Sequence, residues 1–386
     1  MQLSLLIFLL NLLLIASALP TLYKRSFDAE SAYQSALNAT WSLFWNSQYD
    51  AFNLNDPACT SEFSYAAVWD LAVVGKAIVD SGDVAKTEDI INSLYKFQNS
   101  AGWFTSLPGG SEIYTDDNAQ VVWVFLAAYE LTKNQQLLNT AVNLIHLIQT
   151  QWSAIGGVTW QKDETYVASI STVEAALAAV KVYEQNGDES LLTFANSSLT
   201  WLDEHLTDPT DGFYYDGINR QTWQLNKGKL TYTVGVAIST YSYLYKFTGD
   251  EAYLEKAIAK ASATLQSTTF LSPNGAWNNQ LCYVHLLFAG FADLITITGI
   301  TQYTEAVTNQ ANFIYLYDQL TQGSYGWYGS DLSLYNNYVK STGDTKSISY
   351  SYSADNYCST NPTQPKRSAL DDGSAAQIFY NVARIN

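Results

Sequence analysis

The feature that most constrains this chain is an alternation of two kinds of helical segment. Residues 231–245, TYTVGVAISTYSYLY, carry no charged side chain, whereas the next segment, DEAYLEKAIAK (250–260), carries five charges in an amphipathic pattern. Residues 119–129 are likewise uncharged, and 281–292 carry no charge apart from one histidine. A helix that is apolar all round is buried on all sides, and an amphipathic helix keeps one wet face. The alternation therefore predicts concentric rings, with inner helices enclosed by outer ones.

Short turns containing glycine separate the paired helices. SGDVAK, NGDESLL and TGDEAYL recur along the chain, and in each the glycine can end one helix in the left-handed conformation while the aspartate caps the next. We predict twelve helices, near 28–47, 62–81, 84–98, 117–132, 135–151, 166–185, 189–205, 231–247, 251–266, 280–297, 301–319 and 372–384. Six hairpins that close on themselves form an all-α fold, the (α/α)6 barrel. An open superhelix of hairpins is the alternative.

Three long loops precede predicted inner helices. They are NSAGWFTSLPGGSEIYTDD (99–117), GGVTWQKDETY (156–166) and DPTDGFYYDGINRQTWQLNKGKL (208–230), and all are rich in glycine, aromatic and acidic residues. In a barrel of hairpins the starts of the inner helices lie at one mouth, so these loops gather there. Because function concentrates on loops held by a rigid scaffold, we expect the site at that mouth.

The N-terminus has the composition of a secretory signal. An apolar run, LSLLIFLLNLLLIA, leads into the small residues Ala16-Ser17-Ala18, which fit a cleavage site. Lys24-Arg25 then offers a dibasic processing site. We predict a signal peptide at 1–18, a propeptide at 19–25 and a single barrel domain at 26–386, in a secreted, extracellular protein. An N-terminal anchor helix is the alternative, although the run is short for a membrane span.

The chain is acidic. Its formal net charge is −17, and removal of residues 1–25 would delete two basic and no acidic residues, leaving −19. Such a chain is a poor binder of nucleic acid or of an anionic membrane, so we expect neither as a partner, and we expect a monomer.

Three cysteines and two sequons fit an oxidising, secretory environment. One cysteine pair and one leftover thiol are expected, and a bond between Cys59 and Cys358 would join the beginning of the chain to its end. Asn38 and Asn196 each begin an N-glycosylation sequon.

The residues that best fit catalysis are two adjacent carboxylates, Asp116 and Asp117, placed before a long apolar run. The three histidines, His146, His205 and His285, are scattered without metal-ligand spacing, so we expect no metal and no cofactor. Glycoside hydrolysis requires two carboxyl groups, and at a helix start neighbouring side chains diverge by roughly 100° and can face one cavity. Mutual repulsion would keep one acid protonated, while the helix N-terminus favours the ionised one. A helix cap with an acidic first turn is the alternative.

Several motifs give the chain a family resemblance. The segment YTDDNAQVVWVFLAAYELT (114–132) resembles the Asp-Asp-Asn-Ala element of glycoside hydrolase family 76, the endo-α-1,6-mannanases and their fungal cell-wall relatives. Three further segments are similar to family elements in the expected order: GGVTWQ (156–161), DPTDGFYYDGIN (208–219) and LTYTVGVAISTYSYLYKFTGD (230–250). The resemblance covers most of residues 28–384.

The resemblance implies an (α/α)6 barrel and a retaining mechanism. It makes Asp116 the nucleophile and Asp117 the general acid/base. Asp216 would hydrogen-bond the sugar in the cleavage subsite, although an aspartate before glycine is also a common turn residue. Further candidates for the substrate-binding wall of the cleft are Tyr114, Asn118, Trp160 and Tyr232.

The chain departs from the family pattern at polar and basic positions. The family usually continues Asp-Asp-Asn-Ala with tryptophan, but here Gln120 and Val121 follow. Val234 stands where the family has glutamine, and CYVHLLFAGFADL (282–294) has apolar or small residues in place of a lysine and an arginine. Both aspartates are present, so the departures concern the substrate more than the chemistry.

Three functions follow as hypotheses. The first is a secreted glycoside hydrolase that cleaves α-mannosidic linkages by double displacement, with α-1,6-mannan or a glycoprotein glycan as its partner. The second is a cell-wall transglycosidase that passes the same intermediate to another sugar. The third is a non-catalytic mannan-binding protein.

Overall fold

The computed structural model describes residues 27–272, 275–320, 328–329 and 357–386. The predicted signal peptide and propeptide lie outside the described residues. The helices in the described part are α2 (Ala29–Phe44), α3 (Val68–Asp80), α4 (Val84–Tyr95), α5 (Thr115–Thr132), α6 (Gln135–Gln149), α7 (Ser169–Asn186), α8 (Glu189–His205), α9 (Thr231–Thr248), α10 (Glu251–Thr264), α11 (Leu281–Thr298), α12 (Thr304–Tyr317) and α14 (Ala369–Ala383). Each corresponds to one of the twelve predicted helices, with shifts at the ends.

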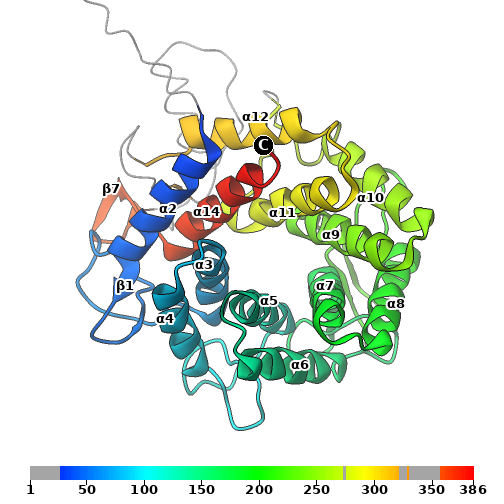
Figure 1. The fold of residues 1–386 in the computed structure, drawn as a ribbon, viewed down its shortest axis with the longest axis horizontal. Helices are drawn as coiled ribbons and strands as arrows, with labels where there is room; N and C mark the ends of the chain where they lie inside the picture. The colour runs from blue at the N-terminus through cyan, green and yellow to red at the C-terminus, as the bar shows by residue number, and fades with distance from the viewer. Residues whose placement is uncertain (1–26, 273–274, 321–327, 330–356) are drawn as a thin grey trace, which may run out of the picture.

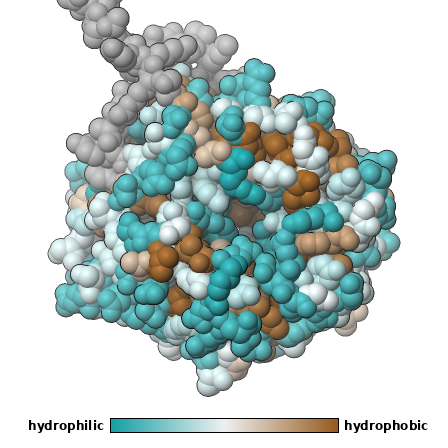
Figure 2. Space-filling view, in the orientation of Figure 1, coloured by the Kyte–Doolittle hydropathy of each residue, from teal (hydrophilic) through white to brown (hydrophobic). Residues whose placement is uncertain are grey.

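The helices form two concentric rings (Figure 1). The inner ring is made by α3, α5, α7, α9, α11 and α14; each packs on the next, and α14 packs back on α3. The outer ring contains α2, α4, α6, α8, α10 and α12. The predicted (α/α)6 barrel is confirmed, and because the inner ring closes, the open superhelix is wrong. The ring is hollowed at its centre on the face seen in Figure 2.

Burial separates the two rings as the charge pattern predicts. On inner helix α9, 12 of 18 residues are buried, whereas outer helix α10 buries only Ala257, Ala261 and Thr264. α11 is long and apolar enough to cross a membrane by length and composition, but it is mostly buried as an inner wall. α9 and α11 pack backbone to backbone at Gly235 and Gly290, where a Cβ on either residue would clash with the main chain of the other helix.

The turns between inner and outer helices have the predicted chemistry. Gly187 and Gly249 end α7 and α9 with positive φ, and Asp188 and Asp250 then cap α8 and α10 through their side chains. After α5 the left-handed position is held by Lys133, at φ 56°, in place of glycine. Since each tight turn follows an inner helix, the longer loops that the structure describes in full lead into inner helices at the opposite mouth.

The two ends of the chain complete the ring. Outer helix α2 packs on inner helix α14, so the last hairpin pairs the first and last described helices. The predicted bond between Cys59 and Cys358 is present, with Cα atoms 5.1 Å apart, and Cys282 is a buried free thiol. The Arg367 guanidinium also donates to both oxygens of fully buried Asp56, at 2.9 and 2.7 Å.

Short strands brace the loops that precede the helices. β1 (Trp45–Asn46) pairs with β2 (Ala51–Phe52), and β6 (Tyr357–Cys358) pairs with β7 (Asn361–Pro365). β3 (Tyr166–Ala168), β4 (Gly217–Asn219) and β5 (Leu225–Asn226) form an antiparallel three-stranded sheet. This sheet ties the loop before α7 to the loop before α9.

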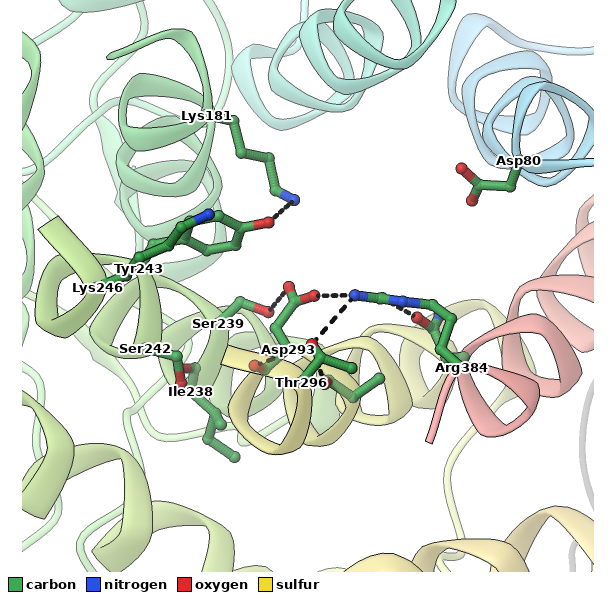
Figure 3. Close-up of polar contacts among 12 residues, drawn as sticks. Asp80, Lys181, Ile238, Ser239, Ser242, Tyr243, Lys246, Asp293, Thr296 and Arg384 are labelled. Carbon is green, nitrogen blue, oxygen red and sulfur yellow. Dashed lines mark hydrogen bonds and ion pairs between the residues drawn. The ribbon is translucent and has the colours of Figure 1, made fainter. Parts of the chain in front are cut away.

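A polar network fastens the inner helices near their C-terminal ends (Figure 3). Asp293 on α11 accepts from Arg384 on α14 at 3.0 Å and from Ser239 on α9 at 2.8 Å. Lys181 on α7 donates to the Tyr243 hydroxyl on α9 at 3.2 Å. Four neighbouring helices are thereby joined at the mouth that has the tight turns.

The two sequon asparagines lie on the outer ring. Asn38 is exposed on α2, and Asn196 is exposed on α8, where its amide oxygen accepts from the Tyr253 hydroxyl at 2.8 Å. Both positions face solvent, and their glycosylation stays a prediction.

Candidate active site

A cleft of about 290 Å³ opens among the first turns of the inner helices. The described residues that line it are Ala67, Trp69, Ser106, Tyr114, Asp116, Asp117, Gln120, Trp160, Ile170, Glu174, Tyr232, Cys282, Tyr283 and Leu286. They come from the starts of α3, α5, α7, α9 and α11 and from the loops before them. The cleft is therefore at the mouth where the long loops were expected to gather.

Asp116 and Asp117 lie in the first turn of α5, which begins at Thr115, two residues before the predicted start. The Thr115 backbone N–H donates to the carbonyl of Trp160 at 2.8 Å, and its hydroxyl donates to the carbonyls of Thr159 and Trp160. The helix start is thus pinned to the loop that follows α6. Both aspartates line the same cleft.

The two carboxyl groups have different surroundings. Asp116 Oδ2 accepts from the indole Nε1 of Trp160 at 3.0 Å. Burial raises the pKa of Asp116 to about 7, although hydrogen bonds from the backbone of the first turn and from Trp160 oppose the rise. Burial also raises the pKa of Asp117, and the negative charges of Asp116 and then Asp70 raise it further. Among the described residues, donors that favour the charged form reach Asp116 and not Asp117, so ionisation of the pair favours Asp116 and the shared proton favours Asp117.

Three predicted wall residues line the cleft. Tyr114 packs on Trp160 with ring centroids 4.9 Å apart, and Tyr232 packs on Tyr283 with centroids 5.1 Å apart. Tyr232 and the Tyr114–Trp160 pair extend from different elements, so aromatic surface is present on more than one side of the two aspartates.

Asn118 does not line the cleft. It is fully buried, its Oδ1 accepts from the Phe104 N–H at 2.9 Å, and its Nδ2 donates to the carbonyls of Phe104 and Tyr114. The predicted role in substrate binding therefore has no support from its position. Its amide is used to hold the loop before α5 against the first turn of that helix.

Asp216 lies beside the cleft and not among its lining residues. Its Oδ2 accepts from the Tyr166 hydroxyl and from Asn226 Nδ2, the latter at 2.8 Å. It is near enough for its charge to raise the pKa of Asp116. Its carbonyl accepts from the Ser169 N–H at 2.8 Å, which fixes the start of α7 to the loop before β4.

Comparison with known proteins agrees with this geometry. Residues 28–354 match the family described as glycosyl hydrolase family 76. The chain belongs to this family. The meiotically up-regulated gene 191 protein of Schizosaccharomyces pombe is 28% identical over 203 residues. That match covers 46% of this chain and 46% of the curated relative, so it spans about half of either protein.

Solved structures share the fold. A family 76 α-mannanase from Bacteroides thetaiotaomicron superposes with a TM-score of 0.75 at 18% identity, covering 93% of this chain and 96% of that one. An inactive variant of the α-1,6-mannanase from Salegentibacter sp. HEL1_6, substituted at two adjacent aspartates and bound to α-1,6-mannotetrose, gives a TM-score of 0.75 at 18% identity, covering 93% and 100%.

Glu174 on α7 and Gln120 on α5 are among the cleft residues that were not proposed for the site from the sequence. Glu174 is fully buried, and its Oε1 accepts from Gln120 Nε2 at 3.0 Å. One signal was available, because Glu174 is the only charged residue in the stretch SISTVEAALAAV (169–180). Gln120 stands where family 76 usually has tryptophan, so the departure noted in the sequence lies in the cleft itself.

The cleft is acidic and aromatic. Among the described residues that line it, there is no lysine, arginine or histidine. α11 contributes Cys282, Tyr283 and Leu286. His285 on the same helix is fully buried outside the lining, and burial lowers its pKa to about 4, so it is neutral. Tyr283 also stacks on Trp69 of α3, with centroids 6.2 Å apart.

Proposed function

We propose that the protein is a secreted, retaining glycoside hydrolase that cleaves α-mannosidic linkages, with α-1,6-mannan of fungal or microbial cell walls as its substrate. The observation that carries the proposal is the pair of adjacent carboxyls in one cleft, of which Asp116 receives hydrogen bonds that favour its charged form and Asp117 has a pKa raised further by that charge. Family membership supports the glycosidase chemistry.

In the proposed reaction, Asp116 attacks the anomeric carbon while Asp117 gives its proton to the departing glycosidic oxygen. The bond between the anomeric carbon and that oxygen breaks, and an ester forms between the sugar and Asp116. Asp117, now ionised, takes a proton from water, and the resulting hydroxide equivalent attacks the anomeric carbon. Asp116 leaves as carboxylate, Asp117 regains its proton, and the sugar keeps its original anomeric configuration.

The substrate class is supported by the related mannanase that binds α-1,6-mannotetrose and is inactive when two adjacent aspartates are replaced. The aromatic rings of Tyr114, Trp160 and Tyr232 offer apolar surfaces on which sugar faces stack. Secretion is supported by the disulfide between Cys59 and Cys358, since such bonds persist in oxidising compartments.

Incubation of the purified protein with linear α-1,6-mannan tests the proposal. We expect release of mannooligosaccharides whose reducing ends are first formed as the α-anomer, detected by proton NMR at early times. Asp117→Asn should remove this activity without lowering the melting temperature. Absence of cleavage of α-mannans and of mannoprotein glycans over long incubation would exclude the hydrolase.

Transglycosylation is a second candidate, because the same ester can react with a sugar hydroxyl in place of water. The Trp69–Tyr283 stack favours it, as it gives an acceptor sugar a platform on another side of the cleft from Trp160. A fluorescent mannotriose acceptor supplied with mannan distinguishes the two reactions. Labelled products longer than the acceptor indicate transfer, and unlabelled fragments alone indicate hydrolysis.

A further inference from the structure

The cleft contains two buried carboxyl oxygens that lack hydrogen-bond partners among the described residues: Oδ1 of Asp116 and Oε2 of Glu174. In each residue the other oxygen is bonded, to Trp160 Nε1 for Asp116 and to Gln120 Nε2 for Glu174. A buried oxygen without a partner costs about 1–3 kcal/mol, so two such atoms in one cleft call for an explanation.

A proton shared between the carboxyl groups of Asp116 and Glu174 would give both oxygens a hydrogen-bond partner. Two carboxylates have only acceptors and leave each other unsatisfied, but a carboxylic acid carries one O–H donor. If Glu174 is protonated, its free oxygen can donate, and the free oxygen of Asp116 can accept. Glu174 and Asp116 come from neighbouring helices of the inner ring, α7 and α5, and line the same cleft.

The balance of charge in the cleft favours a protonated Glu174. Asp116, Asp117 and Glu174 line a cleft in which the described residues include no basic side chain. Three carboxylates cannot all be ionised there without counter-charge, because burial strongly disfavours uncompensated charge. With no basic side chain among the described lining residues, protons are left to provide the neutralisation.

Of Asp116 and Glu174, it is Glu174 that carries the proton in this arrangement. Asp116 receives an indole N–H and lies at the N-terminus of α5, both of which stabilise its anion. Glu174 receives only the amide of Gln120 and lies within α7, beyond its first turn. Burial, followed by the charge of Asp116, raises the pKa of Glu174 well above its ordinary value.

We propose that Glu174 is a positioning residue for Asp116: its carboxylic acid hydrogen-bonds through Oε2 to Oδ1 of Asp116 and keeps that aspartate ionised and oriented for attack. Gln120, one helical turn after Asp116 on α5, fixes the other oxygen of Glu174 and so sets the direction of the acid proton. The kinetic effects expected from this inference rest on the proposed function, but the protonation of Glu174 does not.

Other groups also act on this pair. Asp117 on α5, Tyr232 on α9 and Asp216 beside the cleft interact with the pair through their charges. The neighbouring titratable groups are Cys282 and Tyr283 of α11 in the cleft lining, Asp70 on α3, which acts on Asp117, Tyr166, which donates to Asp216, and exposed Lys366, which acts on Asp70. Variants at Glu174 that leave all of these groups in place isolate its contribution.

Two substitutions of Glu174 by side chains of similar length distinguish a role in hydrogen bonding from a role in packing. Glu174→Gln keeps an N–H donor for Asp116 and an acceptor for Gln120, whereas Glu174→Met keeps only the volume. On α-1,6-mannan, Glu174→Met should lower kcat about tenfold with KM changed less than about threefold. The acidic limb of kcat/KM should move to higher pH, because Asp116 loses a donor to its charged form. Glu174→Gln should restore kcat to within about threefold of the parent and leave that limb in place.

Val180→Ala, a buried change further along α7 and outside the cleft, is the matched control for loss of stability. It should lower the melting temperature and leave the pH profile unchanged. Unchanged kcat and pH profile in Glu174→Met would overturn the proposal. So would a loss in Glu174→Gln as large as that in Glu174→Met, since it would mean that Glu174 must titrate.

An infrared measurement keeps this test independent of mannan turnover. The difference spectrum of the parent protein minus Glu174→Gln at neutral pH should contain a carboxylic-acid C=O band. A carboxylate band in its place contradicts the inference, whatever the activity. If the acid band is present and no α-mannoside is cleaved, the proposed function fails while the protonated Glu174 stands.

Discussion

Trp160 donates its indole N–H to Oδ2 of Asp116 at 3.0 Å across 44 residues of sequence. The same tryptophan accepts, through its carbonyl, the N–H of Thr115 at the start of α5. One loop residue therefore both positions the helix that carries Asp116 and stabilises the charge on that side chain.

Replacement of Trp160 by phenylalanine tests whether the indole N–H stabilises the charge on Asp116. Trp160→Phe keeps an aromatic ring beside Tyr114 and removes the donor, so the pKa of Asp116 should rise. The acidic limb of kcat/KM should move to higher pH, and kcat should fall about tenfold, as expected for a hydrogen bond to a charged group. Trp223→Phe, at a tryptophan that is 63% exposed, is the control. A pH profile unchanged by Trp160→Phe would show that the indole N–H does not stabilise the Asp116 anion.

Leaving-group dependence should distinguish the roles of the two aspartates. Asp117→Ala should slow mannan cleavage by about 10²–10⁴-fold, the usual contribution of general acid catalysis. An aryl α-mannoside whose phenol leaves without protonation should be attacked in this variant nearly as fast as in the parent, giving a burst of phenol. Asp116→Ala should be inactive on both substrates. Equal losses of the two variants on the aryl mannoside would contradict the assignment.

Arg367 should be important for stability because it neutralises Asp56. Burial by itself raises the pKa of Asp56, but hydrogen bonds from Arg367 and from the Ala58 N–H, together with the Arg367 charge, outweigh it and hold the pKa below its ordinary value. Arg367→Met leaves a buried charge unpaired and should cost about 3–5 kcal/mol of unfolding free energy at neutral pH. The parent gains this stability above the unfolded pKa of aspartate and loses it as the pH falls, so the difference between the two proteins should shrink in acid.

Denaturant melts at neutral and acidic pH measure this difference. The double variant Asp56→Asn/Arg367→Met is the control, and it should be more stable than Arg367→Met alone because no charge is buried. A pH-independent difference between the parent and Arg367→Met would mean that the ion pair does not cause the loss.

The close contact of α9 and α11 should make Gly235 intolerant of a side chain. Gly235→Ala places a Cβ against the backbone of Leu286 and Leu287, which cannot move without shifting α11. We expect a loss of about 3 kcal/mol, at the upper end for overpacking. Gly75→Ala on α3 is the comparison, since its Cβ would meet the Cγ2 methyl of Ile90 at 2.8 Å, a side-chain atom that can give way with less movement of a helix than a backbone contact. Equal melting temperatures for the two variants would contradict this account.

Much of the architecture could be predicted from local pattern. The uncharged run at 231–245 and its charged neighbour predicted an inner and an outer helix, and α9 and α10 have that burial. From the Gly-Asp turns we could predict the residues at which α7 and α9 end and at which α8 and α10 begin. Helical period, capping and amphipathicity involve residues a few positions apart, so the sequence displays them directly.

The paired aspartates were also evident, because two neighbours at a helix start need no fold to bring them together. Their surroundings were not evident. Asn118 has the same local context as Asp117, yet its side chain turns to the Phe104 backbone and away from the cleft. Glu174 is the only charged residue between 169 and 180, and nothing near it in sequence indicates that it pairs with Gln120, 54 residues away.

The sequence by itself thus determined the helices, the division into two rings and the position of Asp116 and Asp117 at a helix start. Only the tertiary structure decided that the chain's ends close the ring, that Trp160 and Gln120 meet the acidic groups, and which carboxyl keeps its proton. The physical reason is that helix formation depends on neighbours along the chain. Burial, hydrogen bonding and pKa depend on neighbours in space, and in a ring of hairpins these come from segments 44 and 54 residues apart.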